Sequence, residues 1–101
     1  MSYQVIVSKR AQKDVRVIVR QMVKASPKKV DSWRDALGVA LESLNKWPAR
    51  CPLIKEETKT KGLRQLLFDQ YRIIFSIIDD EVVWVVHVRH QRQKPLSFVD
   101  I

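Results

Sequence analysis

Cysteine, glycine and proline are all scarce in this 101-residue chain, which has one cysteine, two glycines and four prolines. The single cysteine, Cys51, excludes an intrachain disulfide and a cysteine-based zinc finger, and it favours a reducing compartment such as the cytoplasm. So few glycines and prolines exclude collagen-like and linker-rich chains. The apolar runs are short beside the roughly 20 residues that span a membrane, and no secretion signal is expected.

Acidic residues are also few relative to basic ones. Nineteen Lys and Arg residues against eleven Asp and Glu give a net charge of +8. Most of the excess lies in residues 1–30, where eight basic residues stand against one acid, Asp14. A compact basic protein attracts polyanions such as nucleic acid or an acidic protein segment. The alternative is a basic surface that only contacts solvent.

The hydrophobic pattern predicts one α+β domain spanning residues 1–101. A short strand is expected over 3–7, and helices over 9–25 and 27–47, with Ser8 and Ser26 as capping residues. A loop over 48–62 precedes three strands within 63–90, which form an antiparallel meander, and a tail follows over 91–101. The two helices should form an antiparallel hairpin that packs on the sheet.

If the turn at Asp79-Asp80 has two residues, the side of the sheet on which each residue of the last two strands lies can be predicted. Arg72 then lies opposite His87 on an open face, with Arg89 one step further along, while the other face is apolar and receives the helices. Two guanidinium groups and an imidazole suit a phosphate or carboxylate, and an imidazole can transfer protons. The alternative is a solvated polar sheet face. The basic character continues past the strand in His90, Arg92 and Lys94.

Motifs for other chemistries are missing, since the chain has no P-loop, GxGxxG, GxSxG or HExxH. His87 and His90 are three residues apart on a predicted strand and so lie on opposite faces, which makes a two-histidine metal site unlikely. No metal or other cofactor is expected. Cys51 lies close to two prolines, and we interpret it as a neutral structural thiol rather than a nucleophile.

Several short motifs follow one another along nearly the whole chain. They are Tyr3 to Ser8 before a basic helix, Trp47-Pro48, Pro52, Gly62-Leu63-Arg64, Tyr71 to Phe75, and Val86 to Arg92. Their order and spacing resemble the RelE/ParE toxins of bacterial type II toxin–antitoxin pairs. The resemblance implies a two-helix hairpin packed on a small antiparallel sheet, with the first strand at an edge or paired with the meander.

The resemblance also implies a cytoplasmic toxin that inhibits growth and is neutralised by a cognate antitoxin in a hetero-oligomer. ParE-like members inhibit DNA gyrase, whereas RelE-like members cut messenger RNA on the ribosome. Arg16 and Arg20, on the basic helix, are the candidate antitoxin-binding residues. Arg64, Arg89 and Lys94 are the candidates for binding the target or nucleic acid.

Site residues carry over from the family position by position. Arg72 matches the strand arginine and Arg92 the arginine after the last strand, with His87 or His90 available for proton transfer in a ribonuclease. RNA-cleaving members often have a tyrosine where this chain has Phe98, and lysines on the strand that here reads Leu63-Arg64-Gln65-Leu66-Leu67. These departures favour a non-enzymatic ParE-like toxin over an endoribonuclease. An inactive basic nucleic-acid-binding module is the third hypothesis.

Overall fold

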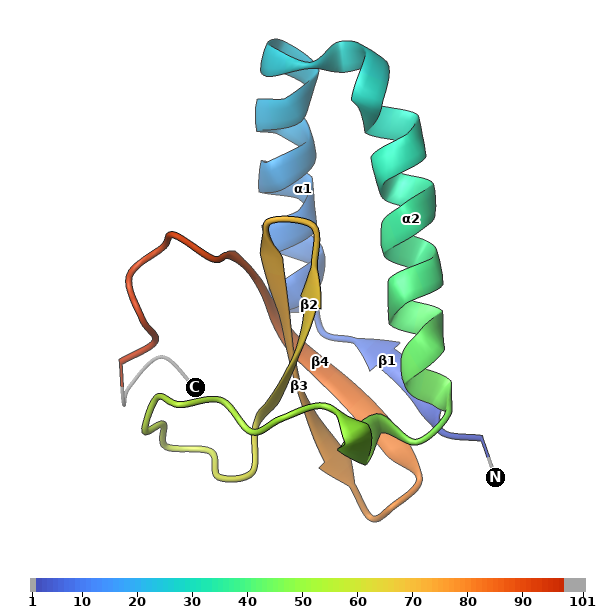
Figure 1. Ribbon diagram of the computed structural model, residues 1–101, viewed down its shortest axis with the longest axis vertical. Coiled ribbons are helices and arrows are strands. Elements are labelled where there is room, and N and C mark those ends of the chain that lie inside the picture. The colour runs from blue at the N-terminus through green and yellow to red at the C-terminus, as the bar shows by residue number, and fades with distance from the viewer. Residues whose placement is uncertain (1, 98–101) are drawn as a thin grey trace.

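A computed structural model describes residues 2–97 and has two helices packed on a four-stranded sheet (Figure 1). The strands are β1 (Gln4–Val7), β2 (Arg64–Phe68), β3 (Tyr71–Ile78) and β4 (Val82–His90), and the helices are α1 (Lys9–Ala25) and α2 (Val30–Glu42). The strand order is β1-β4-β3-β2, with β1 parallel to β4 and the other pairs antiparallel. The expected α+β fold is confirmed, and β1 both forms an edge and pairs with the meander.

Helix α1 begins where the sequence predicts, directly after Ser8. The Ser8 hydroxyl oxygen accepts a hydrogen bond from the backbone N–H of Ala11 at 3.1 Å. This bond satisfies one of the N–H groups that the first turn of a helix leaves without a partner. The cap fixes the direction in which the chain leaves β1 and turns back over the sheet.

The predicted second helix over 27–47 is shorter and less regular than expected. It divides into a 3₁₀ turn at Pro27–Lys29, the α-helix α2, and a second 3₁₀ turn at Ser43–Asn45. Ser26 makes no side-chain cap, and instead its backbone N–H donates to the carbonyl of Met22 at 2.7 Å, closing the end of α1. Trp47, directly before Pro48, takes a left-handed conformation with φ of 46°, which is uncommon for a residue with a bulky side chain.

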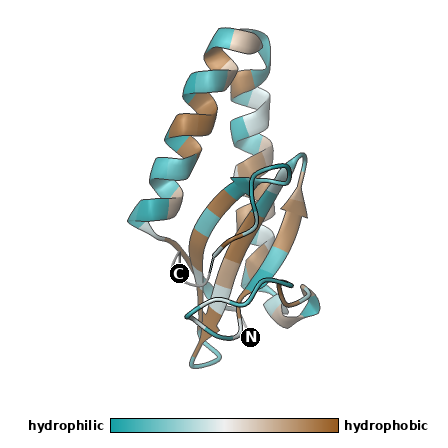
Figure 2. Ribbon diagram, turned by 90° about the vertical axis from the view of Figure 1, so that its left-hand side faces the viewer, coloured by the Kyte–Doolittle hydropathy of each residue, from teal (hydrophilic) through white to brown (hydrophobic). Residues whose placement is uncertain are grey.

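Most of the core lies between the two helices and one face of the sheet. Ile73 and Phe75 of β3 and Val83 and Val85 of β4 are completely buried there, against Leu37 of α2. Apolar residues recur along the strands and along the helices (Figure 2). A second, smaller cluster on the opposite face consists of Leu63, Ile74 and Leu96.

The β3–β4 turn differs from the two-residue turn that we expected. Ile78 pairs with Val82, so the turn has three residues, and its first two, Asp79 and Asp80, both have positive φ. The odd length moves Val83 and Val85 onto the helix-covered face and Trp84 onto the other, the reverse of the prediction. A one-residue turn difference has this effect because side chains alternate along a strand.

A β-bulge then adjusts the pairing along β4. Phe75 pairs with Val85 but Ile74 pairs with His87, so Val86 is the extra residue. Beyond this bulge Val88 faces the helices, as predicted, and the register continues to the end of the strand. Without the bulge, alternation from Val83 and Val85 would place His87 on the helix-covered face. The bulge instead pairs His87 with Ile74, which belongs to the smaller cluster.

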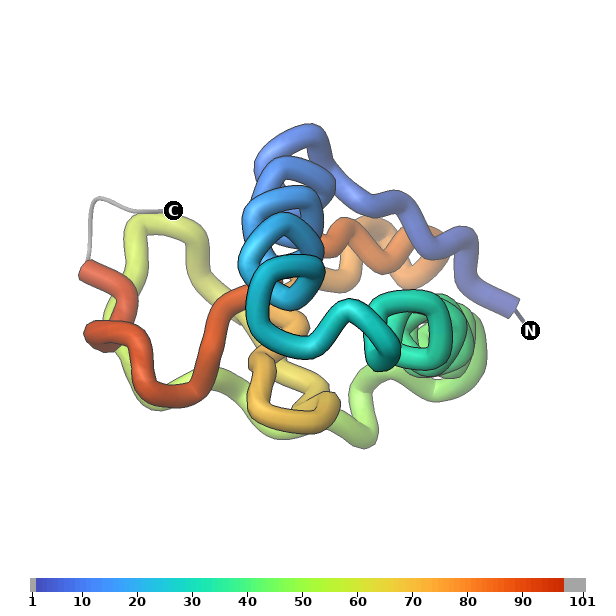
Figure 3. The backbone as a smooth tube through the Cα atoms, turned by 90° about the horizontal axis from the view of Figure 1, so that it is seen from above, coloured from blue at the N-terminus to red at the C-terminus, as the bar shows by residue number. Residues whose placement is uncertain are grey.

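The segment over 48–62 and the chain after β4 lie together beside the face of the sheet that the helices leave uncovered (Figures 1 and 3). A 3₁₀ turn at Pro48–Arg50 begins the segment, and Leu53 forms an isolated bridge with Arg64 of β2. The Leu96 N–H joins the two segments by donating to the Glu56 carboxylate at 3.2 Å. Within residues 2–97, no helix has the length and apolarity needed to cross a bilayer.

Candidate functional site

The uncovered face of the sheet holds two of the predicted site residues side by side. Arg72 of β3 pairs in register with Arg89 of β4, and not with His87 as we expected. A cavity of about 480 Å³ adjoins Arg72 between the loop and the C-terminal segment. Its lining includes Lys55, Glu56, Gln65, Arg72, Gln91 and Gln93.

Arg72 is held by two neighbouring side chains through three hydrogen bonds. Its Nη1 and Nη2 donate to the two Glu56 carboxylate oxygens at 2.7 and 2.8 Å, and its Nε donates to the Gln65 side-chain carbonyl at 2.7 Å. Such a two-point contact is the strongest arrangement between a guanidinium and a carboxylate. A phosphate would have to displace Glu56 to take up this two-point contact.

Glu56 remains ionised far below neutral pH. The hydrogen bonds from Arg72 lower the pKa of Glu56 to about 2, against the opposing effect of burial, and the Leu96 N–H contributes in the same direction. The carboxylate therefore neutralises Arg72 throughout the physiological range. Of the two arginines paired at the centre of the sheet face, Arg72 therefore has a compensated charge.

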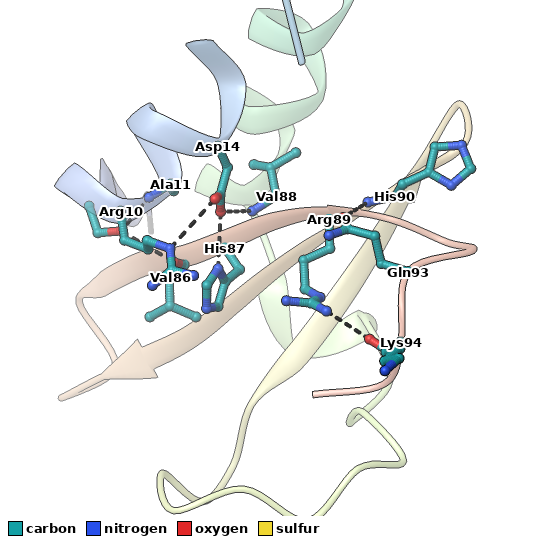
Figure 4. Close-up of polar contacts among 11 residues, drawn as sticks. Arg10, Ala11, Asp14, Val86, His87, Val88, Arg89, His90, Gln93 and Lys94 are labelled. Carbon is teal, nitrogen blue, oxygen red and sulfur yellow. Dashed lines mark hydrogen bonds and ion pairs between the residues drawn. The ribbon is translucent and has the colours of Figure 1, made fainter. Parts of the chain in front are cut away.

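His87 is not exposed on the open face, which corrects the prediction. Its side chain is only 3% exposed, and its Nδ1 lies 3.0 Å from Oδ2 of Asp14, which projects from α1 toward β4 (Figure 4). The same oxygen accepts the Val88 N–H at 3.0 Å. His87 therefore connects the helix to the bulged strand, and its side-chain contact is with Asp14, whereas Arg72 contacts Glu56.

Asp14 is the partner that holds His87. Burial raises the pKa of Asp14, but the hydrogen bonds from His87 and the Val88 N–H outweigh it, so the pKa lies below its usual value. Arg10 adds a longer contact of 3.6 Å on the exposed side. An ionised carboxylate accepts hydrogen bonds only, which places a proton on Nδ1 of His87.

The residues at the end of β4 interact mainly with one another. Arg89 donates from Nη2 to the Lys94 carbonyl at 2.7 Å, and His90 points to the other side of the strand (Figure 4). The His90 Nδ1 accepts the Arg92 N–H at 3.0 Å, so Nε2 carries the proton toward the Gln70 side-chain carbonyl at 3.1 Å. The Arg92 and Lys94 residues are exposed.

The other candidate residues lie apart from this group. Arg64 donates from Nη1 to the carbonyl of Cys51 at 2.6 Å, and this hydrogen bond connects the loop to β2. Arg16 and Arg20 are exposed on α1, as the helical spacing predicts. Phe98, the residue in the position of the family tyrosine, lies outside the described residues.

Cys51 is buried, and it has the environment of a structural thiol. Burial raises the pKa of the Cys51 thiol, and the nearby Arg50 and Arg64 only partly oppose that effect. The thiol is therefore neutral at physiological pH. Over residues 2–97, the structure brings no three His, Cys, Asp or Glu side chains together as metal ligands.

Sequence reasoning missed two site residues, Asp14 and Glu56. Asp14 carries a weak signal, because it is the one acid among eight basic residues at the N-terminal end of the chain. Glu56 carries none, because it lies in a non-periodic loop sixteen residues before its partner, Arg72. Each acid contacts a residue that we had expected to be available for chemistry. Asp14 contacts His87, and Glu56 contacts Arg72.

Comparison with known proteins supplies a family. The family model for the ParE toxin of the type II toxin–antitoxin system parDE matches residues 5–95. No curated protein matches the chain.

Two solved structures are similar in fold. One is from the chromosomal ParDE toxin–antitoxin system of P. aeruginosa, with a TM-score of 0.69 and 12% identity over 88% of this chain and 96% of that one. The other is from the RelBE2 toxin–antitoxin complex of Mycobacterium tuberculosis, with a TM-score of 0.57 and 17% identity over 89% of this chain and 99% of that one. At these identities the two structures support the fold alone.

Proposed function

The chain belongs to the ParE toxin family of type II toxin–antitoxin systems, and from this membership we propose that it inhibits growth by binding a cellular target, DNA gyrase, rather than by catalysis. The toxin would act in the cytoplasm, where that target lies. A cognate antitoxin would neutralise it in a hetero-oligomeric complex.

The observation that carries this proposal is the state of Arg72 and His87. A ribonuclease that uses the sheet face needs a free cation for the phosphate and a nearby group for proton transfer. Arg72 is held by Glu56 and Gln65, while His87 is buried against Asp14. Both side chains are held by other groups of the protein, which supports binding of a protein target over cleavage of RNA on this face.

The exposed positive charge supports two binding roles. The α1 surface presents basic residues at helical spacing, which would attract an acidic antitoxin segment. Its members are Lys9, Lys13, Arg16, Arg20 and Lys24. Arg92 and Lys94 follow β4 and would contact the target, with Arg64 and Arg89 positioning the segments beside them.

The second candidate function is a ribosome-dependent messenger RNA endoribonuclease. His90 and Arg92 favour it, because an exposed arginine lies two residues from an imidazole whose Nε2 carries a proton. In that reaction Nδ1 of His90, once released from the Arg92 N–H, would take the proton of the ribose 2′-hydroxyl as that oxygen attacks phosphorus. The imidazolium would return a proton to the leaving 5′-oxygen, and Arg92 would stabilise the charge on the phosphorane.

Induced expression tests the choice. We expect induction to arrest growth with a DNA-damage response while protein synthesis continues, and the purified chain to inhibit supercoiling by gyrase. Early loss of protein synthesis with messenger RNA cleavage, and no DNA-damage response, would instead support the endoribonuclease. Absence of any growth effect would favour an inactive nucleic-acid-binding module, which binding to RNA and DNA would then test.

A further inference from the structure

The two edges of the sheet differ in how the chain covers them. At the β2 edge the loop lies against the strand, where the Gln65 N–H donates to the Pro52 carbonyl at 3.0 Å. Beyond β1 lies no further strand of residues 2–97, and Figure 3 shows this N-terminal segment, in dark blue, along the outside of the molecule. The β1 edge of the sheet is therefore open.

Nothing in the sequence of β1 protects this edge against pairing. Residues 3–7 are a tyrosine, a glutamine, two valines and an isoleucine, with no charge and no proline, in a chain in which 30% of the residues are charged. The strand pairs with β4 in a continuous register. Natural edge strands normally have a lysine, a proline or a bulge that prevents association with another strand. The absence of all three favours a strand that has a partner.

The backbone groups of β1 face β4 and the open edge in turn. Gln4 directs its N–H to β4, where the Glu81 carbonyl accepts it at 2.9 Å, and Ser8 does the same four residues later. Successive residues of a strand direct their N–H and C=O groups to opposite sides. The backbone groups of Val5 and Val7 therefore face outward, away from β4.

The chain itself closes both ends of this outward row. The Tyr3 N–H donates to the Asn45 carbonyl at 2.7 Å. At the other end, the Val7 carbonyl accepts from the Gln12 side-chain amide at 2.9 Å. Between these closed groups lie the Tyr3 C=O, the Val5 N–H and C=O, and the Val7 N–H. They form a short row of two donors and two acceptors.

This row is complementary to itself about a two-fold axis at Val5. In an antiparallel pair, opposite residues exchange both of their backbone hydrogen bonds. With Val5 opposite Val5 of a second copy, the two valines make two such bonds, and each Val7 N–H donates to the Tyr3 C=O of the other copy. Every group in the row then has a partner. A two-fold axis at Ile6 would instead place the Val5 N–H opposite a carbonyl that Gln12 already occupies.

The side chains beside this edge favour the same arrangement. A cavity of about 350 Å³ lies between β1, the end of α2 and the turn that follows it. Its lining residues are Tyr3, Val5, Val7, Leu41, Glu42 and Asn45. A strand added at this edge continues the sheet, so its side chains would cover the apolar part of this cavity. On the other face, Ile6 lies in register with Trp84, which is 36% exposed.

The two ends of β1 have charges of opposite sign. Glu42 lines the same cavity as Tyr3, and the Tyr3 hydroxyl donates to the Asp80 carboxylate. At the other end Lys9 begins α1, two residues after Val7. Antiparallel pairing brings the acidic end of one copy toward the basic end of the other. This complementarity favours a second copy of the chain as the partner, although its net charge is +8.

We propose that two copies of this chain associate by antiparallel pairing of their β1 edges, which joins their two sheets into one. This association is additional to the proposed binding of a target and an antitoxin. The interface consists of two short strands and the side chains beside them, so the dimer is weak and reversible, with a Kd between about 10 µM and about 1 mM.

Sedimentation and amide hydrogen exchange of the whole purified chain test the pairing together. We expect the monomer to convert to a dimer as the concentration rises from about 10 µM to about 1 mM. Over the same range the Val5 and Val7 amides should exchange severalfold more slowly, as followed by NMR. The Gln4 and Ile6 amides are the internal control, because they face β4 and should be protected at every concentration.

A substitution at Val5 separates the edge from the fold. Val5→Pro removes the outward N–H but leaves the N–H groups that bond to β4. It should weaken dimerisation at least about tenfold, because it removes the two central hydrogen bonds. Val5→Thr is the matched control, since it keeps the amide and the β-branched shape, and it should still dimerise. Circular dichroism establishes that each variant is folded.

A chain that stays monomeric up to about 1 mM, with Val5 and Val7 amides that exchange freely, would overturn the inference. A folded Val5→Pro variant that dimerises as well as the parent would do the same. If that variant does not fold, the concentration dependence of the two amides in the unmodified chain decides. Protection of these amides only in the antitoxin complex would assign the edge to the antitoxin and so contradict the dimer. Supercoiling assays measure gyrase inhibition separately from all of these results.

Discussion

Glu56 and Arg72, sixteen residues apart in the sequence, form a two-point ion pair with N–O distances of 2.7 and 2.8 Å. The same carboxylate accepts the Leu96 N–H at 3.2 Å. One side chain of the loop therefore connects β3 to the segment that follows β4. The pair both fixes the shape of the uncovered sheet face and removes its central cation from solvent.

Glu56→Gln should lower the free energy of unfolding at pH 7. The pKa of Glu56 falls from 4.5 to about 2 on folding, and a depressed carboxyl pKa stabilises the fold above the unfolded value. That stability, about 3 kcal/mol, should be lost as the pH falls from about 5 to about 2. Urea unfolding at several pH values measures it.

The matched control for this prediction is Glu57→Gln, at the exposed neighbouring position. It should change stability by less than about 0.5 kcal/mol. If the Glu56→Gln variant kept the pH dependence of the unmodified chain between pH 5 and pH 2, the assigned role of the ion pair would be wrong.

His87→Ala should destabilise the fold by about 2 kcal/mol, because it opens space under α1 and removes a partner from the buried side of Asp14. For a chain of this size, that loss corresponds to a fall in Tm of roughly 8–16 °C. Arg10→Ala, which removes the exposed contact of the same carboxylate, should cost less than about 0.5 kcal/mol. Calorimetry checks both, and a His87→Ala variant as stable as the parent would contradict the buried role.

Arg16→Glu combined with Arg20→Glu should weaken the antitoxin complex at least tenfold at low salt, mainly through slower association. The affinity of the unmodified chain should fall as salt rises, because exposed charges are screened. Lys59→Glu, in the exposed loop, is the control and should have a much smaller effect. A complex that responds neither to salt nor to the double reversal would show that the α1 surface does not bind the antitoxin.

Arg92→Ala combined with Lys94→Ala should reduce gyrase inhibition about tenfold while stability changes by less than about 0.5 kcal/mol, since both side chains are exposed. Supercoiling assays and growth after induction measure the first quantity, and thermal unfolding the second. Lys46→Ala with Lys59→Ala removes the same amount of charge elsewhere and should retain inhibition. Loss of toxicity in this variant and in His90→Ala, with gyrase inhibition unchanged, would support the endoribonuclease, in which both Arg92 and His90 act.

The sequence predicts α1 and the order of the strands well, because their signals are local. Polar and apolar residues alternate with helical spacing in α1, and Ser8 lies at the one position where a cap is needed. The side of the sheet on which each β4 residue lies was not predictable in this way. Val82 to Val86 is apolar at every position, so it lacks the alternation that would distinguish a two-residue from a three-residue turn.

The candidate site was predicted less well, for a different reason. The exposed positions of Arg16 and Arg20 follow from periodicity within one helix. The states of Arg72 and His87 depend on Glu56 and Asp14, which come from elements far away in the chain. Spacing within one segment contains no information about such partners, and the bulge at Val86 gives no signal of its own.

The position of β4 between β1 and β3 has a consequence for the order in which the molecule can assemble. The last strand to emerge from the ribosome lies in the interior of the sheet, so β1 has no sheet neighbour until synthesis has passed residue 82. Pairings between such distant segments form late and slowly. A nascent or prematurely terminated chain therefore has helices but no complete sheet. Toxicity should accordingly begin only after residue 90 has been translated.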